Sequence, residues 1–410
     1  MYVKVLTFIR FFLVENFIYI LGGIWHHRKL SHFNFNLGKF HSHKTARTTL
    51  KQKIEWLINL NIAVIRHGQR SPQTTYPNDP YKNDPMEPYG WGQLTKEGRL
   101  SQYQQGLFLR SRYGTFLGSK YSPEIFWLQS TDVDRAKSSA LLEAAGLWMP
   151  DGNQSFSREL AWQPISLNYQ TSQNDNLLLI RSSCPDYSRM REAILKSDNI
   201  SKINDINFNL YQKLTNNSGQ EITNPDDVFD LYSTLIAEQT MNLLLPNWTA
   251  DIFTEMEHLS SLSLKINVYN ETLLKMKAGP LVTEITTNML KKSKNTLVPE
   301  RRKMFMYVGH DSTIASLLEG LKVWNMQVPG YNDMVITELH EDKSGFYVKV
   351  YLRNCTRSDP YSLKIPGCNI ECPINQFIDI LNQLVITPSE WKSICELKNP
   401  NYVPGKEPLP

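Results

Sequence analysis

Apolar residues between positions 56 and 150 form two alternating patterns. Short runs rich in β-branched residues predict buried strands at 56–65 (WLINLNIAVI) and 125–130 (IFWLQS). Each run is followed by a longer segment with apolar residues at helical spacing, which predicts amphipathic helices over 94–117 and 134–149. Strands that alternate with helices are typical of an α/β domain with a mainly parallel sheet.

The pattern loosens after residue 150 and becomes regular again after residue 260. Breaks rich in Asn and Ser alternate with helical pieces over 151–260, so we predict a mainly helical insert there. We place 56–150 and 261–396 in one α/β core, followed by a C-terminal tail at 397–410. The second part of this core predicts a helix, a strand, a helix and two closing strands joined by a Lys-Ser-Gly turn, at 271–292, 304–309, 311–321, 336–342 and 345–354.

The first 55 residues differ in character from the rest. The longest uninterrupted apolar stretch, Phe17–Trp25, has nine residues, too few to span about 30 Å of hydrocarbon. We therefore expect a signal peptide or a signal anchor at 1–25, or else a first exon that does not belong to the protein. Residues 26–55 predict a basic, flexible linker. The irregular spacing of its histidines favours a solvated tail over a metal-binding tract; they are His26, His27, His32, His41 and His43.

Charge is unevenly distributed along the chain. Residues 1–55 carry nine Lys and Arg against two acidic residues, whereas the remainder carries 35 basic and 38 acidic residues. A body with this balance has no basic field for nucleic acid, so we exclude a nucleic-acid partner. The five cysteines include no Cys-x-x-Cys pair and indicate neither a disulfide-rich scaffold nor a zinc site. Six sequons favour a secretory route with glycosylation at Asn153, Asn199, Asn216, Asn247, Asn270 and Asn354.

A histidine between two arginines follows the first predicted strand. Arg66, His67 and Arg70 lie in the sequence RHGQRSP, and the carboxyl ends of strands in open α/β sheets form ligand sites. Gly68 allows a tight turn and a close approach to a ligand, and two guanidinium groups suit a phosphate. The alternative is a hydrogen-bonded core histidine between two surface arginines, which the Arg-x-Pro that follows makes less favourable.

Two further predicted strand ends carry candidate groups. His310 and Asp311 open a helix whose N-terminus offers backbone N–H groups to an anion, although Asp311 could serve only as a helix cap. Arg135, in the sequence STDVDR, adds a third guanidinium group. The acids of the same segment, Asp132 and Asp134, are better explained as residues that favour the first turn of a helix.

The carboxyl ends of parallel strands should meet at one edge of the sheet. This places three guanidinium groups, two imidazoles and one carboxyl group together: Arg66, Arg70, Arg135, His67, His310 and Asp311. The set supplies cations for the phosphate oxygens, an in-line nucleophile and a proton for the leaving alkoxide, as phosphoryl transfer requires. The sequence has neither a GxxxxGK[ST] motif nor a carboxylate-rich metal cluster, so we predict a site without a metal or cofactor.

Four blocks of this sequence closely resemble the histidine acid phosphatase family. They are RHGQRSP, GWGQLTKEGRLSQYQQGLFLRSRYGTFLG, STDVDRAKSSALLEAAGL and YVGHDSTIASLLEGL, and the similarity runs from about residue 60 to 396. The resemblance implies an α/β fold with a phosphoglycerate-mutase-like three-layer core, a mainly parallel sheet and a helical cap. It also implies an acid phosphatase that acts on small phosphomonoesters without a metal and often forms a homodimer.

The resemblance further implies a role for each candidate residue. His67 is expected to be the nucleophile that forms a phosphohistidine, and Asp311 the proton donor. The residues expected to hold the phosphate are Arg66, Arg70, Arg135 and His310. Two family disulfides have counterparts here, Cys184–Cys395 and Cys368–Cys372. A third does not, because Met334 and its neighbours stand where one partner is expected, and we therefore predict that Cys355 is a free thiol.

The substrate and the location of the enzyme are open at this stage. A specialised lysophosphatidate or inositol polyphosphate phosphatase is one alternative, but the loop Pro72–Trp91 holds a single basic residue, Lys82, which favours less charged substrates. A catalytically idle secreted binding or allergen-like protein is another, although every catalytic position is intact. We expect a secreted or lysosomal, lumenal protein.

Overall fold

The computed structural model describes residues 58–179, 184–354, 359–397 and 401–403, all of which belong to the unit Lys53–Pro410. The predicted signal or anchor segment at 1–25, the linker at 26–55 with its histidines, and Cys355 lie outside the described residues. Within the described part of the chain, no helix combines the length and the apolar character that crossing a membrane requires.

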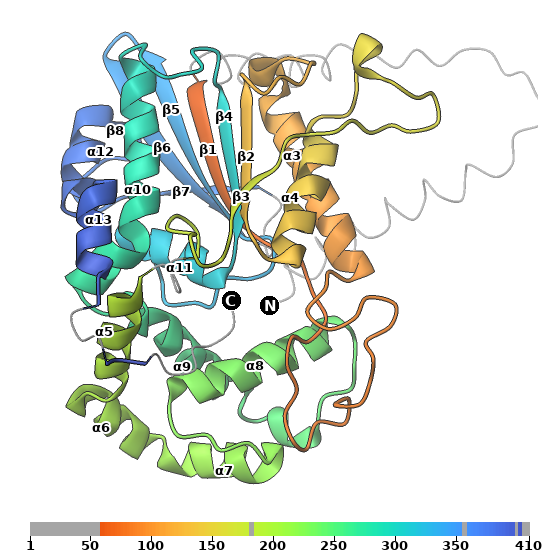
Figure 1. The fold of residues 1–410 in the computed structure, drawn as a ribbon, viewed down its shortest axis with the longest axis vertical. Helices are drawn as coiled ribbons and strands as arrows, with labels where there is room; N and C mark the ends of the chain where they lie inside the picture. Colours follow the sequence, from red (N-terminus) through yellow and green to blue (C-terminus); the bar gives the residue numbers. More distant parts are fainter. Residues whose placement is uncertain (1–57, 180–183, 355–358, 398–400, 404–410) are drawn as a thin grey trace, which may run out of the picture. The chain divides into compact units, whose positions relative to one another are not determined.

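The described residues contain a mixed sheet of eight strands (Figure 1). Their order is β3-β2-β4-β1-β5-β6-β7, and β8 pairs with β6. The pairs among β3, β2, β4 and β1 are parallel, and the remaining pairs are antiparallel. The strands are β1 (Ile58–Arg66), β2 (Phe126–Thr131), β3 (Asn168–Gln170), β4 (Met304–Gly309), β5 (Met334–Asp342), β6 (Gly345–Arg353), β7 (Tyr361–Leu363) and β8 (Cys372–Pro373).

Helices cover both faces of this sheet, which gives the predicted three layers. Alternate residues of β1 face the two layers, since side chains of a strand point to opposite sides. Ile62 and Val64 join a core cluster with α10 and α11, whereas Ala63 and Ile65 join another with α3 and α4. The core helices are α3 (Lys96–Leu117), α4 (Asp134–Leu147), α10 (Glu271–Ser293), α11 (Asp311–Gly320), α12 (Ile374–Leu381) and α13 (Pro388–Cys395).

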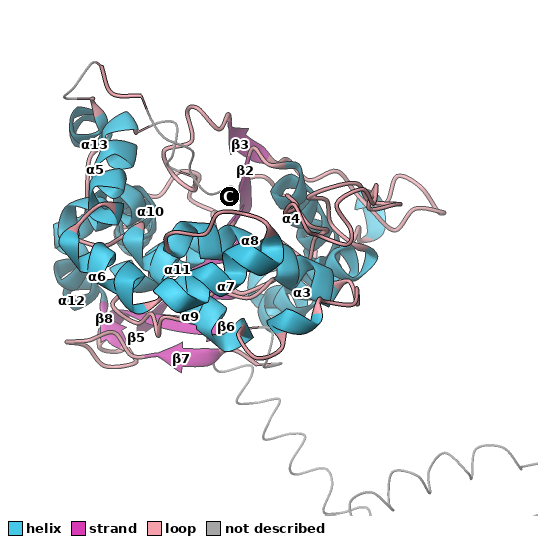
Figure 2. Cartoon of the chain, turned by 90° about the horizontal axis from the view of Figure 1, so that it is seen from below, coloured by secondary structure: helices cyan, strands magenta, loops and turns pink. Residues whose placement is uncertain are grey.

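A group of helices, here called the cap, lies beyond the carboxyl ends of the parallel strands (Figures 1 and 2). It consists of α5 (Pro185–Leu195), α6 (Asp198–Ile206), α7 (Phe208–Ser218), α8 (Pro225–Thr240) and α9 (Phe253–Ile266). The insert predicted over 151–260 is therefore helical mainly from Pro185 onwards. Its first part contains β3, which pairs with β2 as an edge strand of the core sheet. Short 3₁₀ turns lie at Gly152–Gln154, Asn247–Thr249 and Asn382–Leu384.

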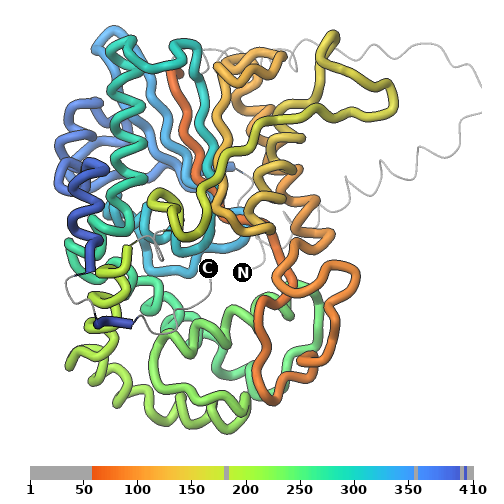
Figure 3. The backbone as a smooth tube through the Cα atoms, viewed as in Figure 1, coloured from red at the N-terminus to blue at the C-terminus, as the bar shows by residue number. Residues whose placement is uncertain are grey.

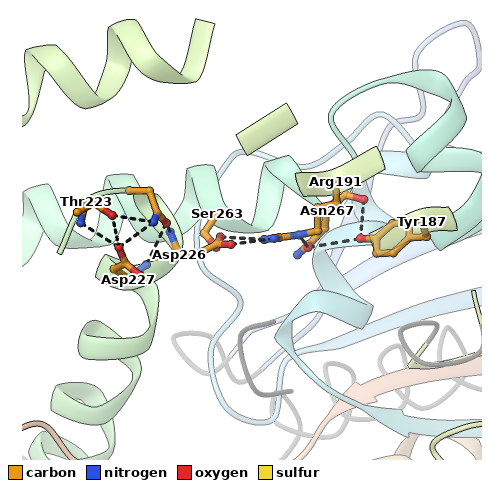
Figure 4. Close-up of polar contacts among 8 residues, drawn as sticks. Tyr187, Arg191, Thr223, Asp226, Asp227, Ser263 and Asn267 are labelled. Atoms are coloured by element: carbon orange, nitrogen blue, oxygen red, sulfur yellow. Dashed lines mark hydrogen bonds and ion pairs between the residues drawn. The ribbon is translucent and has the colours of Figure 1, made fainter. Parts of the chain in front are cut away.

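A buried polar network joins α5, α8 and the end of α9 (Figure 4). Arg191 donates from its two terminal nitrogens to the two carboxylate oxygens of Asp226, each at 2.8 Å, and from Nε to Asn267 Oδ1 at 2.7 Å. Ser263 donates to Asp226 Oδ1 at 2.5 Å. Tyr187 donates to the carbonyl oxygen of Asn267 at 2.9 Å. The cap is thus held together by matched charges as well as by apolar packing.

Covalent and polar contacts attach the cap to the core. Both predicted disulfides are present, and the bridge Cys184–Cys395 ties the start of α5 to the end of α13, while Cys368–Cys372 closes a short loop before β8. The segment that follows β1 also leaves the core and runs beside the cap (Figure 3). There Asn78 N–H donates to the carbonyl oxygen of Ser218 at 2.9 Å.

Candidate active site

The predicted strand ends meet at one edge of the sheet. Arg66 at the end of β1 pairs with Gly309 at the end of β4, and β2 pairs with β4 on its other side. His67 and His310 follow these strands, and their ring centroids lie 5.4 Å apart. Arg135 reaches the same point from the first turn of α4 and contacts His67. Residues from three separate parts of the chain therefore surround one position.

Hydrogen bonds determine the tautomer of His67. Its Nδ1 lies 2.9 Å from the carbonyl oxygen of Gly68, which can only accept, so Nδ1 carries the proton. Arg135 donates from Nε to Nε2 of His67 at 3.0 Å, and a guanidinium group can only donate, so Nε2 carries the lone pair. A neutral imidazole with this Nε2 lone pair is the form that nucleophilic attack requires.

Burial and neighbouring cations keep His67 uncharged. Its side chain is 2% exposed. Burial is the largest influence that lowers the pKa of His67 well below its ordinary value of 6.5, followed by the charges of Arg135, Arg66, His310 and Arg70. His67 therefore retains its lone pair at acid pH, where a solvent-exposed histidine is protonated.

Arg66 and Arg70 are buried but only partly satisfied. Arg66 Nη2 pairs with Asp311 Oδ2 at 2.8 Å, and Nη1 donates to the carbonyl oxygen of Pro329. Arg70 Nη2 donates to Ser233 Oγ at 2.8 Å. Each arginine nevertheless has a buried Nε–H without an acceptor among the described residues. Buried donors normally have partners, so these groups suit the oxygens of a bound anion.

Arg135 occupies an electrostatically unfavourable position. Burial and the charge of Arg70 lower the pKa of Arg135, and Asp311 only partly opposes this effect. An anion bound between these cations would relieve their repulsion. The cluster is therefore better matched to a phosphate than to an empty cavity.

His310 and Asp311 form the beginning of α11. His310 Nε2 lies 2.9 Å from Thr131 Oγ1 at the end of β2, which fixes the orientation of the ring. Asp311 Oδ1 accepts from the N–H of Ser312 at 2.6 Å, while Oδ2 faces Arg66. The N-cap of α11 is His310, so the interpretation of Asp311 as the helix cap is wrong. Asp311 is the first residue of the helix, and its Oδ2 pairs with Arg66.

The acids of the STDVDR segment do not join the site. Asp132 and Asp134 instead pair with Lys137 at 2.8 and 3.2 Å. Asp134 lies in the first turn of α4 as expected, whereas Asp132 precedes the helix and its N-cap, Val133. Across the residues that the structure describes, no group of three or more His, Cys, Asp or Glu side chains is arranged to hold a metal.

Tyr331 and Ser139 contribute to the site without having been indicated by any sequence pattern. The Arg66 guanidinium carbon lies 4.5 Å from the centre of the Tyr331 ring, which also lies 5.8 Å from the His67 ring. Ser139 Oγ accepts from the N–H of Gly68 at 3.1 Å and holds the turn after β1. A single Tyr in a loop and a single Ser in a helix carry no sequence signal that could have identified them.

Gly68 is required by a close approach of two backbone segments. A Cβ atom at this position would lie 2.7 Å from the carbonyl oxygen of Gly98 and 2.8 Å from Cγ of Gln102. Both contacts are too short for a side chain, so Gly68 lets the turn that carries His67 pack directly against α3.

A cavity of about 190 Å³ opens beside Arg66 and Asp311. Its walls come from α8 and the segment 328–331 and are largely apolar or aromatic: Phe229, Tyr232, Ile236, Val328 and Tyr331, with hydroxyl groups from Ser233 and Thr240. A larger cavity of about 400 Å³ between α10 and α13 contains none of the candidate site residues. The smaller cavity is therefore the one suited to the group that leaves from a phosphate.

The predicted glycosylation sites lie at accessible positions. Asn153, Asn199, Asn216, Asn247 and Asn270 are exposed, and Asn354 is partly exposed. Their modification remains a prediction.

The fold and the position of these residues place the chain in a family. Residues 57–353 match the histidine phosphatase superfamily (branch 2), so the chain belongs to this superfamily. The match includes the ends of β1, β2 and β4 and therefore all six candidate residues. It confirms the family resemblance seen in the sequence and the prediction of a phosphoric monoester hydrolase.

Among its relatives over most of the chain are several acid phosphatases. The prostatic acid phosphatase of Rattus norvegicus is 36% identical over 343 residues, 81% of this chain and 87% of that protein. The venom acid phosphatase of Apis mellifera is 34% identical over 81% of this chain and 86% of that protein. The lysosomal acid phosphatase of Homo sapiens is 32% identical over 81% of this chain and 78% of that protein.

Solved structures support the fold class. The apo form of the Hafnia alvei phytase has a TM-score of 0.60 over 83% of this chain and 98% of that one, at 15% sequence identity. At this identity the likeness shows the fold alone. It is consistent with the predicted three-layer core.

Proposed function

We propose that this protein is an acid phosphatase that hydrolyses phosphate monoesters through a phosphohistidine on His67, with Asp311 as proton donor. The observation that carries the proposal is the lone pair on His67 Nε2, in a ring kept neutral by burial and surrounded by cations. The names of the prostatic, venom and lysosomal relatives support the reaction class.

The first step transfers the phosphoryl group to His67. The phosphate oxygens bind to the cation cluster, namely Arg66, Arg70, Arg135 and His310. The Nε2 lone pair attacks phosphorus as the bond from phosphorus to the leaving oxygen breaks, and the leaving alkoxide takes the proton of the Asp311 carboxyl group. The His67 Nδ1–H remains bonded to the Gly68 carbonyl, which stabilises the ring as it becomes cationic.

The second step returns the enzyme to its starting state. A water molecule attacks phosphorus and gives one proton to the Asp311 carboxylate, and the bond from phosphorus to Nε2 breaks to release phosphate. The contact of Asp311 with Arg66 holds the carboxyl group at the mouth of the cavity in both steps. A carboxyl group is protonated mainly at acid pH, so we expect an acid optimum for the first step.

The cavity favours a leaving group with apolar or aromatic character. Its lining contains one cation, Arg66, among the residues that the structure describes, and the rest is mainly apolar. An inositol polyphosphate would need several cations for its additional phosphates. This lining supports aryl or acylglycerol phosphates, including lysophosphatidate, over polyphosphates.

A comparison of wild type with His67→Ala tests the proposal. Hydrolysis of p-nitrophenyl phosphate is measured from about pH 3 to 9 with EDTA present. We expect activity with an acid optimum in EDTA and a loss of at least about 10⁴-fold in the variant, because no nucleophile remains. A folded wild-type protein without activity would contradict the proposal and favour the idle binding protein.

We also propose that the protein passes through the secretory pathway to a secreted or lysosomal location. The two disulfides and the exposed sequons support this route. Glycosidase treatment should lower the apparent mass of the natural protein. The sequence-based prediction of a free thiol at Cys355 stands with this proposal, and titration of the denatured protein that finds no free thiol would contradict it.

We also propose that the protein forms a homodimer. β3 is an edge strand of the sheet and carries the exposed Tyr169, and exposed Phe156, Leu160 and Trp162 lie on the segment that leads to it. Large apolar side chains near an unpaired edge favour self-association. Light scattering should detect a dimer in wild type and a monomer in Tyr169→Arg; an unchanged mass would place the interface elsewhere.

A further inference from the structure

Two buried carboxyl groups meet where the segment after β1 contacts the cap. Glu238 of α8 is 0% exposed, and Asp79 of the loop Pro72–Trp91, here called the Pro-rich loop, is 3% exposed. The charge of Asp79 acts on Glu238, and neither side-chain oxygen of Glu238 has a donor among the described residues. Two neighbouring carboxyl groups buried in this way repel each other unless one of them is protonated, so we expect the pair to hold one proton.

Hydrogen-bond donors show which carboxyl group carries that proton. Asp79 accepts from the hydroxyl of Thr75 at 2.5 Å and from the N–H of Tyr81 at 2.6 Å, so its oxygens are supplied with donors. The side-chain oxygens of Glu238 receive no donor from the other described residues. Glu238 is therefore the protonated partner.

The charges around the pair reinforce this assignment. Burial, followed by the charge of Asp79, raises the pKa of Glu238 to about 8. The neighbouring titratable groups are Tyr76 and Tyr81 of the loop; burial and the nearby carboxyl groups raise the pKa of Tyr76, so its phenol stays neutral. Among the residues that the structure describes, no cation is in electrostatic contact with Glu238.

The same contact region contains Arg70, one of the residues proposed to bind the phosphate. Arg70 donates to Ser233 Oγ, one and a half turns before Glu238 on α8, and Gln69 Nε2 donates to the carbonyl oxygen of Thr240 at 2.5 Å. α8 therefore binds both Arg70 and its neighbour Gln69. α8 also supplies Ser233 to the cavity beside Arg66 and Asp311.

We propose that Glu238 and Asp79 are positioning residues that fasten the Pro-rich loop to α8 through one shared proton and so hold Arg70 in its phosphate-binding position. Loss of the proton leaves two buried carboxylates that repel each other, and the loop separates from α8. The fastening is complete at the acid pH of the proposed reaction. The consequence for catalysis rests on the proposed phosphatase function, whereas the consequence for the loop does not.

The raised pKa gives the direction of the pH dependence. Glu238 holds its proton more tightly in the folded protein than in the unfolded chain, where the ordinary value of 4.5 applies. Its contribution to stability is therefore full below about pH 4.5, declines above it and is lost as the pH rises through about 8. A neutral, permanently donating group at position 238 should abolish this decline.

Hydrogen exchange of residues 72–91 in wild type and Glu238→Gln is the direct test. Between about pH 6 and 9, after correction for intrinsic exchange, we expect protection of this loop to fall about tenfold or more in wild type. Protection should stay constant in the variant, because the Gln amide donates to Asp79 at every pH. Glu255→Gln, an exposed position on α9, should behave like wild type. Parallel losses in wild type and Glu238→Gln would overturn the proposal.

Steady-state kinetics supply the second readout. We expect the KM for p-nitrophenyl phosphate to rise with pH about tenfold more in wild type than in Glu238→Gln, with similar values at about pH 5. A KM that rises equally in both would contradict a role in positioning Arg70. If Glu238→Gln does not fold, Asp79→Asn removes the same shared proton and should show the same loss of pH dependence. An inactive wild type with a pH-dependent loop would contradict only the proposed function.

Discussion

Two arginine–aspartate pairs in this protein have the same 2.8 Å contact but different surroundings. In the cap, Arg191 donates two bonds to Asp226 and a third to Asn267, so protein acceptors match its charge and its donors. At the active site, Arg66 makes one bond to Asp311 and has a buried Nε–H without an acceptor among the described residues. The cap pair is complete without a ligand, and the active-site pair is not.

The difference shows that completeness of hydrogen bonding, rather than burial or charge, distinguishes Arg66 and Arg70 from Arg191. Arg191, Arg66 and Arg70 are 4%, 6% and 5% exposed, so burial alone does not distinguish them. A buried donor without a partner costs about 1–3 kcal/mol. The active site retains two such donors, and a bound phosphate can satisfy them.

Replacing each aspartate by asparagine should separate the two pairs most clearly. We expect Asp311→Asn to lower kcat for alkyl phosphates by about 10²–10⁴-fold, because the leaving alkoxide loses its proton donor. The loss should be smaller for p-nitrophenyl phosphate, whose leaving group is stable as an anion. Equal losses for the two substrates would exclude Asp311 as the donor.

Asp226→Asn is the matched control in the cap. It leaves the charge of Arg191 buried without a counter-charge, so we expect a loss of about 3–5 kcal/mol in stability. Its kcat, measured well below the Tm, should stay close to that of wild type. A large loss of kcat in a folded Asp226→Asn protein would show that the two pairs are not independent.

Replacing an arginine at the candidate site and one in the cap should give the second largest difference in activity and stability. We expect Arg135→Met to lower kcat/KM by about 10²–10³-fold, since one cation for the transition state is lost. Its Tm should be unchanged or higher, because burial and Arg70 already disfavour a charge at this position. Arg191→Met should show the reverse: a lower Tm with nearly unchanged kcat/KM below it. Loss of stability in Arg135→Met would contradict the proposed repulsion within the cluster.

The sequence was sufficient to predict where the candidate site residues lie, because local patterns determine the strands that position them. Short apolar runs predicted β1, β2 and β4, and their carboxyl ends place His67, Arg135 and Asp311 together through the geometry of any parallel sheet. The Lys-Ser-Gly turn likewise predicted the hairpin of β5 and β6. These elements depend on residues that are neighbours in the chain.

Contacts between distant segments could not be predicted in this way. Ser233, which binds Arg70 across 163 residues of sequence, has no local signal inside α8. The same applies to the pairing of Arg191 with Asp226. β3 was placed in a helical insert because three residues are too few to form an alternating pattern, and only its pairing with β2 defines it as a strand.

Ser233 binds Arg70 at the candidate site, and Ser263 binds Asp226 in the cap. Replacing these two serines should give the smallest difference in activity and stability. Ser233→Ala removes one neutral acceptor from Arg70, a hydrogen bond worth about 0.5–1.5 kcal/mol, so we expect KM to rise about two- to tenfold with kcat nearly unchanged. Ser263→Ala removes a donor to Asp226 and should lower the Tm slightly without changing KM. Steady-state kinetics and thermal unfolding of both variants separate these outcomes. If Ser233→Ala instead lowers the Tm and leaves KM unchanged, Arg70 is held by α8 for structural reasons, and its unsatisfied Nε–H no longer identifies it as a phosphate ligand.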